Sequence, residues 1–193
     1  MNKDTDLSNL DDESLICLIG DGSHPAFATL VRRHTNRFYR IAYRLVSNRD
    51  DAEDVVQEAF LRIWDRPNLW NPGKGAKFTT WFYKVIINLC FDHNKKKRPL
   101  ALPEGIELTD QNPGQEALFD AHRRQAMLER CIRELPQRQQ LALNLCFYEG
   151  LSHHDAAQIV GVKVKALQSL IMRAKTTLKK KVDRFLLGGS EGK

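Results

Sequence analysis

Long hydrophobic runs and a secretory signal are both missing from the sequence. No stretch of about 18 consecutive apolar residues occurs, so we expect no membrane-spanning helix and no direct membrane insertion. Residues 1–12 are acidic and polar, with no basic segment followed by an apolar core, which argues against a secretory signal peptide. We therefore expect the protein to stay in the cytoplasm.

Cysteine pairs and catalytic side-chain sets are also missing. The four cysteines lack a C-x-x-C pair and lie among apolar residues, at Cys17, Cys90, Cys131 and Cys146. This pattern is typical of buried free thiols and disfavours a disulfide framework or a zinc site. The six histidines are dispersed, and no Ser-His-Asp, Cys-His or metal-ligand set has suitable spacing. We expect a protein that is not an enzyme, with no small-molecule substrate, metal or other cofactor.

The alternation of polar and apolar residues that is typical of strands is absent, and apolar residues instead recur at helical spacing. Pro99 ends one helical stretch, because proline disfavours helical geometry in the residue before it. Residues 99–114 contain further prolines and glycines and few apolar residues that could form a core. The sequence therefore predicts an all-α protein of two small helical domains, 1–98 and 115–193, joined by a flexible linker at 99–114.

Positive charge is clustered in the sequence, which has a net charge of +6. One basic block covers residues 95–98, and a second covers much of 163–184, whereas acidic residues gather at 50–54. A single charge run is most often a solvated helix face. Two basic blocks at the ends of two apolar-striped helices favour a nucleic-acid partner.

The second basic block belongs to a helix-turn-helix pattern. Ser152 and Asp155 form an S-x-x-D capping box for a short helix that ends at Gly161. A three-residue turn, 161–163, leads into a last helix with an apolar stripe. Any two packed helices can share this pattern, so by itself it favours DNA binding without establishing it.

Three segments in this order resemble the extracytoplasmic-function (ECF) sigma factors of the sigma-70 superfamily. The first, DAEDVVQEAFLRIW at 51–64, is similar to the family's region 2.2 motif. The second, FTTWFYKVIIN at 78–88 with Asp92 and the basic block after it, is similar to regions 2.3 and 2.4. The third begins at Leu135-Pro136 and continues through EGLS at 149–152 to RAK at 173–175, and it resembles region 4. The matches cover most of residues 26–181 outside the linker.

The resemblance implies that the first segment binds the clamp coiled coil of the largest RNA polymerase subunit. That role falls on Asp51, Asp54, Gln57 and Glu58. An acidic helix face meeting a basic helical pair gains steering and register from complementary charge. The alternative is that the acids only cap a helix, which explains residues 50–53 in part but not Gln57 and Glu58, beyond the first turn.

The second segment implies capture of a single-stranded minus-ten promoter element, with a flipped base held against the loop before the helix. The implied contacts are Asn71, Lys74, Lys77, Phe78, Trp81, Lys84, Asn88, Lys95, Lys96, Lys97 and Arg98. A tryptophan such as Trp81 is more often a core residue than a stacking surface. Its place on an outward stripe with Lys84 and Asn88 weakens the core interpretation without removing it.

The third segment implies that the last helix binds the minus-thirty-five element as a duplex. The implied contacts are Lys163, Lys165, Gln168, Ser169, Met172 and Arg173. The sequence departs from the family pattern here. The family commonly has a glycine-threonine pair where this chain has Lys165-Ala166. It commonly has a basic residue where this chain has Gln168, and an arginine where this chain has Leu170. These departures concern the DNA contacts more than the fold.

The resemblance implies a sigma factor that binds core RNA polymerase, at the clamp and the flap, and promoter DNA, and that is controlled by an anti-sigma factor. One alternative is a sigma-like mimic that sequesters an anti-sigma factor without binding DNA, which the departures in the last helix motivate. An enzyme is a second alternative, without a suitable residue set. A conventional helix-turn-helix repressor is a third, and it leaves the region 2.2 match without a role.

Overall fold

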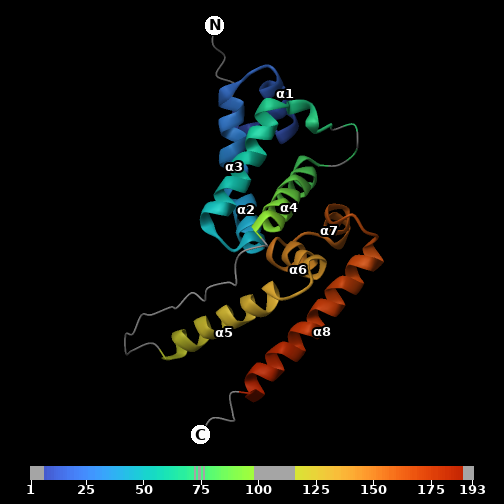
Figure 1. Cartoon of the computed structure of the whole chain (residues 1–193). Coiled ribbons are helices and arrows are strands. Elements are labelled where there is room, and N and C mark those ends of the chain that lie inside the picture. The colour runs from blue at the N-terminus through green and yellow to red at the C-terminus, as the bar shows by residue number, and fades with distance from the viewer. Residues whose placement is uncertain (1–6, 72, 74, 76, 98–115, 189–193) are drawn as a thin grey trace. The chain divides into compact units, whose positions relative to one another are not determined.

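The computed structural model describes residues 7–71, 73, 75, 77–97 and 116–188, and these residues contain helices and no strand (Figure 1). The chain divides into two compact units, Met1–Arg98 and Pro99–Lys193. The expected all-helical fold with two small domains is therefore confirmed. The predicted linker, 99–114, lies outside the described residues.

The first unit contains α1 (Asp12–Gly20), α2 (His24–Val46), α3 (Arg49–Asp65) and α4 (Phe78–Lys97), with short 3-10 turns at Leu7–Asn9 and Pro67–Leu69. Side-chain caps define the starts of its first three α-helices. Asp11 accepts from the Ser14 N–H at 2.7 Å, and Ser23 accepts from the Ala26 N–H at 3.3 Å. Asn48 caps α3 by accepting from the Asp51 N–H at 3.0 Å. Each cap satisfies a backbone donor that the first helical turn leaves unpaired.

Helix α2 forms the centre of the first unit and packs against α1, α3 and α4. The Phe38 ring lies 4.6 Å from the Phe82 ring and 4.9 Å from the Tyr83 ring, measured between centroids. Phe38 and Phe82 are fully buried, and burial of each such side chain contributes about 1.5–3 kcal/mol. These aromatic contacts fix α4 against α2.

Helices α2 and α4 run parallel to each other. His34 of α2 lies 5.6 Å from the Phe78 ring at the start of α4, and Phe38 meets Phe82 one turn later. Near the other end, the Asn94 side chain donates a 2.9 Å hydrogen bond to the Leu45 carbonyl. The contacting pairs therefore advance in the same direction along both helices.

The described part of the second unit contains α5 (Glu116–Arg133), α6 (Gln137–Leu143), a π-helix (Asn144–Tyr148), α7 (His153–Val160) and α8 (Val164–Gly188). Helix α8 packs against α5, α6 and α7. Helix α6 is followed by a single π turn, closed by the Glu149 N–H donating to the Asn144 carbonyl at 3.0 Å.

Helices α7 and α8 form the predicted helix-turn-helix. Ser152 caps α7 by accepting from the Asp155 N–H at 3.1 Å. Gly161 ends α7 with φ of 74°, a left-handed conformation that glycine adopts without steric cost. Leu167 and Ala174 of α8 are fully buried, so the opposite side of α8 is the one that meets solvent.

Candidate functional site

Helix α3 presents an acidic and amide face to solvent. Asp54, Gln57 and Glu58 are all exposed. Glu58 Oε1 accepts a 2.6 Å hydrogen bond from Arg62, and the two side chains remain 55% and 49% exposed. An exposed i,i+4 pair of this kind contributes only about 0.3–0.5 kcal/mol, so a binding partner can displace it at little cost. We call Asp54, Gln57, Glu58 and the neighbouring Leu61 the α3 face.

Asp51 and Leu61 differ from the sequence-based description of this helix. The Asp51 side chain is only 13% exposed, and its Oδ2 lies 3.2 Å from Nε2 of His93 on α4. Asp51 therefore ties α3 to α4 instead of standing on the outer surface. Leu61 was not predicted to be part of the face, yet it is 48% exposed, three residues after Glu58. The sequence signal for this exposed residue was a leucine at a helix position whose neighbours one turn earlier are polar.

The outward stripe of α4 follows the predicted spacing. Lys84, Asn88, Lys95 and Lys96 are exposed, and Trp81 is partly exposed. Lys95 lies 3.9 Å from Asp92, a contact between side chains that are 79% and 65% exposed. The stripe therefore offers ammonium and amide donors along one side of the helix. We call Trp81, Lys84, Asn88, Asp92 and Lys95 the α4 stripe, in which two lysines accompany one aspartate.

The loop before α4 is described in part. Asn71 and Lys77 are exposed, and Asn71 Oδ1 accepts from the Gly73 N–H at 2.8 Å. Lys74 and Arg98 lie outside the described residues, and Lys97 is the last residue of α4.

Phe78 occupies a different place from the other residues predicted to bind the minus-ten element. It is only 3% exposed, and its ring lies 5.8 Å from the Trp70 ring and 5.2 Å from the Phe82 ring. The Trp81 ring lies 6.0 Å away on the solvent side. Phe78 therefore belongs to the core and packs against the Trp81 ring from the buried side. In this conformation Phe78 presents no face on which a base could stack.

Helix α8 carries the third predicted set on its solvent side. Lys163 precedes the helix, and Lys165, Gln168, Met172 and Arg173 follow on it, all exposed. Met172 is 65% exposed, which is high for a methionine. Ser169 is half-buried, and its hydroxyl donates to the Lys165 carbonyl at 3.0 Å, so it is already engaged within the helix. The remaining residues form one cationic and amide face.

Sequence reasoning missed two further surface features. Phe147 in the π turn is 56% exposed, and Nζ of Lys175 lies 4.7 Å from the centre of its ring. Helix α2 contains Arg32, Arg33, Arg37, Arg40 and Arg44 and no acidic residue. The absence of any Asp or Glu between residues 24 and 46 was the signal for the second feature.

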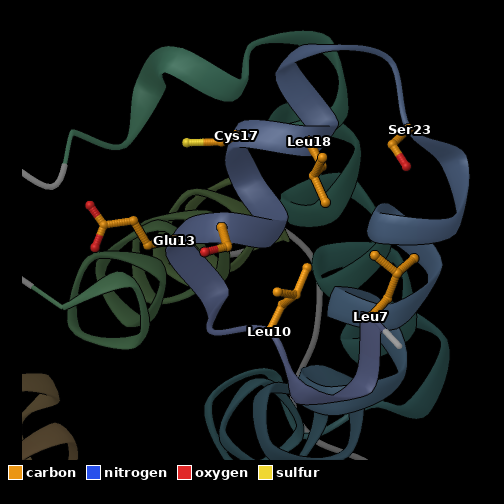
Figure 2. A pocket seen from close by; sticks show the side chains of 7 residues that line it. Leu7, Leu10, Glu13, Cys17, Leu18 and Ser23 are labelled. Carbon is orange, nitrogen blue, oxygen red and sulfur yellow. The ribbon is translucent and has the colours of Figure 1, made fainter. Parts of the chain in front are cut away.

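A hollow on the outside of α1 is separate from these surfaces. It has a volume of about 490 Å³, and it is lined by Leu7, Leu10, Leu18 and Cys17 together with Glu13, Ser14 and Ser23 (Figure 2). Cys17 is exposed, so the prediction that each cysteine is buried is wrong for this one. Cys17 stands at the edge of an open apolar hollow, which explains its apolar neighbours in the sequence.

The part of the chain that the structure describes contains neither a candidate metal site nor a candidate membrane span. Within it, no group of three or more His, Cys, Asp or Glu side chains could hold a metal ion. Over the same residues, no helix combines the length and the apolar character needed to cross a bilayer. The surfaces that remain are the α3 face, the cationic faces of α4 and α8, and the arginines of α2.

Comparisons with known proteins agree on both units. The family model described as Sigma-70 region 2 matches residues 30–99, and the model described as Sigma-70, region 4 matches residues 125–178. The chain is 34% identical over 159 residues to ECF RNA polymerase sigma factor SigE of Mycolicibacterium smegmatis, a match that covers 80% of this chain and 61% of that protein. It is 32% identical over 140 residues to ECF RNA polymerase sigma factor EcfG of Rhodopseudomonas palustris, covering 71% of this chain and 74% of that protein.

One similar solved structure is that of the sigma factor RpoE in complex with the anti-sigma factor NepR from Bartonella quintana. The TM-score is 0.61 at 21% sequence identity, and the match covers 81% of this chain and 96% of that one. At this identity the likeness establishes a shared fold.

Proposed function

Because this chain belongs to the ECF sigma factors of the sigma-70 family, which are transcription initiation factors, we propose that it binds core RNA polymerase and directs it to a specific set of promoters. The observation that carries the proposal is the pairing of two exposed surfaces on one small helical domain. The α3 face is acidic and the α4 stripe is cationic. One domain can then hold an enzyme on one helix and DNA on the other, without any catalytic group of its own.

The α3 face is the proposed polymerase-binding surface. Glu58 and Asp54 supply negative charge, Gln57 supplies amide hydrogen bonds, and Leu61 supplies an apolar contact. Charge complementarity with a basic coiled coil on the polymerase clamp speeds association and fixes the register. The burial of Leu61 adds affinity that does not depend on salt concentration. Asp51 contributes indirectly, by holding α3 against α4 through His93.

The α4 stripe, with the loop before it, is the proposed minus-ten surface. Exposed lysines can pair with phosphates, and the partly exposed ring of Trp81 can stack on an unpaired base. Such stacking is worth about 1–3 kcal/mol per base, which offsets the few kcal/mol needed to take a base out of the duplex. Phe78 holds Trp81 in place from inside the core.

Helix α8 is the proposed minus-thirty-five reader. Lys163 and Lys165, at its start, suit phosphate contacts that position the helix, and Gln168 and Arg173 carry donors that suit base edges. Residues 1–98 would thus form the polymerase and minus-ten domain, 99–114 the linker, and 115–193 the minus-thirty-five domain. The second domain would also meet the polymerase flap.

Control by an anti-sigma factor is part of the proposal. The structurally similar RpoE of Bartonella quintana was solved in complex with the anti-sigma factor NepR. We propose that a protein of that kind covers the polymerase-binding surface of this chain until a signal releases it. The site of action is the cytoplasm, where the polymerase and the promoters are.

A charge-reversal pair on α3 tests the polymerase contact. Glu58→Lys changes the α3 face, whereas Glu53→Lys makes the same change at an exposed position five residues earlier, about 140° from Glu58 around the helix. We expect Glu58→Lys to weaken binding to purified core polymerase about tenfold or more, as measured by fluorescence anisotropy of labelled protein. Glu53→Lys should stay near wild type.

Runoff transcription with core polymerase and a pool of genomic fragments tests the whole function. We expect discrete promoter-specific transcripts that depend on the added protein. A stable polymerase complex without any transcript would count against promoter recognition. Binding to an anti-sigma factor without binding to polymerase or DNA would favour the mimic instead.

A further inference from the structure

The solvent face of α2 has a composition that the fold alone does not require. Arg32, Asn36, Arg40 and Tyr43 are exposed and recur at steps of three or four residues, opposite a buried side that includes Phe38. Arg40 lies three residues after Arg37 and four before Arg44, spacings at which like charges repel each other on a helix surface. Since α2 contains no acidic residue, no ion pair within the helix offsets this repulsion. This concentration of positive charge favours an anionic partner.

Specific contacts explain the positions of Arg33 and Arg37 on α2. Arg33 pairs with Asp12 at 2.6 Å and donates to the Ser8 and Leu10 carbonyls at 3.1 and 2.8 Å, so it fixes the segment before α1. Arg37 donates to the Tyr83 hydroxyl at 2.7 Å and lies over the same ring. These contacts explain why arginines occupy positions 33 and 37. They do not explain why an exposed arginine occupies position 40.

The α2 arginines lie next to the proposed single-strand surface. Helices α2 and α4 run side by side and parallel, and Arg37 reaches Tyr83, which is buried on the side of α4 that faces α2. A strand held along the α4 stripe would therefore pass one helix away from the arginines of α2. This neighbourhood favours an unpaired DNA strand over another anionic partner.

An exposed aromatic pair accompanies the arginines. The rings of Tyr39 and Tyr43 lie 6.1 Å apart with an interplanar angle of 16°, and Tyr43 is 41% exposed. Tyr43 lies on the helix between Arg40 and Arg44. Cationic side chains around an exposed ring are the combination by which proteins hold single strands, because every unpaired base offers a face for stacking. Bases within a duplex offer no such face.

We propose that the outer face of α2 is a second single-strand surface, which continues the track of the α4 stripe. Arg40 and Asn36 contact the phosphate backbone there, and Tyr43 stacks on a base of the melted strand beyond the minus-ten element. The inference rests on the proposed function, because it needs a promoter strand already held by α4. It adds a DNA-contacting role to a helix whose other side forms the core.

The test uses holoenzyme assembled from the full chain and core polymerase, bound to labelled fork DNA with a single-stranded tail. Arg40→Ala and Tyr43→Leu probe the surface, and Arg66→Ala, an exposed arginine after α3, is the matched control. We expect each test variant to weaken fork binding about fivefold or more, since one phosphate or stacking contact is worth about 1 kcal/mol. Arg40→Ala should also reduce the magnitude of the slope of log affinity against log salt by about 0.7, the value for one single-strand phosphate contact.

The outcomes separate this inference from the proposed function. Variants that bind the fork with wild-type affinity and slope would overturn the inference and leave the proposed function intact. Variants that lose core polymerase binding instead would show that α2 docks on protein, which also overturns it. A wild-type chain that forms no holoenzyme would overturn both. Circular dichroism of each variant shows that a loss of binding is not a loss of fold.

Discussion

Arg37 Nε donates a 2.7 Å hydrogen bond to the Tyr83 hydroxyl, and the guanidinium carbon of Arg37 lies 5.2 Å from the centre of the Tyr83 ring. Tyr83 is only 1% exposed, so its hydroxyl needs a partner inside the protein. The pair joins the central helix of the first domain to the helix proposed to hold the melted strand. The position of the α4 stripe therefore depends on α2.

Tyr83→Phe tests how strongly this pair holds the domain together. The substitution removes the hydroxyl and leaves the ring in the core, so it deletes a hydrogen bond to a charged group. We expect the free energy of unfolding to fall by about 1–2 kcal/mol, measured by urea denaturation. Tyr43→Phe is the control, because Tyr43 is 41% exposed and should change stability by less than about 0.5 kcal/mol. Equal unfolding midpoints for the two variants would contradict the role of the pair.

Asp12 makes the stability of the first domain depend on pH. Burial raises the pKa of Asp12, but the hydrogen bonds from His34 at 2.9 Å and Arg33 at 2.6 Å outweigh it and hold the pKa below its ordinary value. A carboxyl whose pKa is lower in the folded state stabilises the fold above its unfolded pKa. That contribution is lost as pH falls through the lowered value.

Asp12→Asn should therefore be less stable than wild type at neutral pH. The difference in unfolding midpoint should shrink as pH falls below the ordinary aspartate pKa, because the wild-type carboxylate becomes protonated. Thermal unfolding of both proteins over a series of pH values measures this. Asp183→Asn, at an exposed position on α8, is the control and should follow wild type throughout. A constant difference at every pH would show that Asp12 acts only through its shape.

Features set by local chemistry could be predicted from the sequence. Ser152 caps α7 as its S-x-x-D pattern predicted, since capping depends on residues within one turn. The glycine-containing turn between α7 and α8 also follows from local backbone preference, with Gly161 at positive φ. The π turn at Asn144–Tyr148 gave no comparable local signal.

The candidate site was predictable only where helical spacing decides exposure. Phe78 was expected to contact the minus-ten element. Helix α4 begins at Phe78, which places this residue one turn before Phe82 on the same buried side. Its place in the helix thus puts the side chain in the core instead of on the surface.

The four cysteines should react at very different rates. Cys17 is exposed, whereas Cys90 and Cys131 are buried, and burial raises the pKa of the Cys90 thiol to about 12. The thiolate is the reactive form, so Cys90 should be protected both by its surroundings and by its protonation. With a maleimide at neutral pH we expect Cys17 to be labelled first and Cys90 only when the domain unfolds. Peptide mass spectrometry over time measures the order.

Labelling in concentrated urea provides the control, because all four thiols should then react at similar rates. Cys17→Ser should remove the fast phase and leave the others unchanged. Rapid labelling of Cys90 in the native protein would mean that α4 separates from α2 and α3 far more often than its buried core indicates.

The exposed face of α8 contains two kinds of proposed DNA contact, which two substitutions should separate. Lys163, before the first turn, is placed for a phosphate, and Gln168, one turn into the helix, is placed for a base edge. Lys163→Ala should weaken binding to all duplexes alike and reduce the magnitude of the salt slope by about 0.9, the value for one contact to duplex phosphate. Gln168→Ala should leave that slope unchanged and relax sequence preference at one position by about 1–3 kcal/mol.

Selection from a randomised duplex pool, followed by titration of the selected sites at several salt concentrations, measures both effects. Lys180→Ala is the control, because Lys180 is exposed on the same helix but lies two turns beyond Arg173, the last of the proposed contacts. If Lys163→Ala and Gln168→Ala changed affinity, slope and preference in the same way, the division into positioning and reading contacts would be wrong. If neither differed from Lys180→Ala, the departures of this helix from the family pattern would have removed the minus-thirty-five contact, and promoter choice would depend on the first domain.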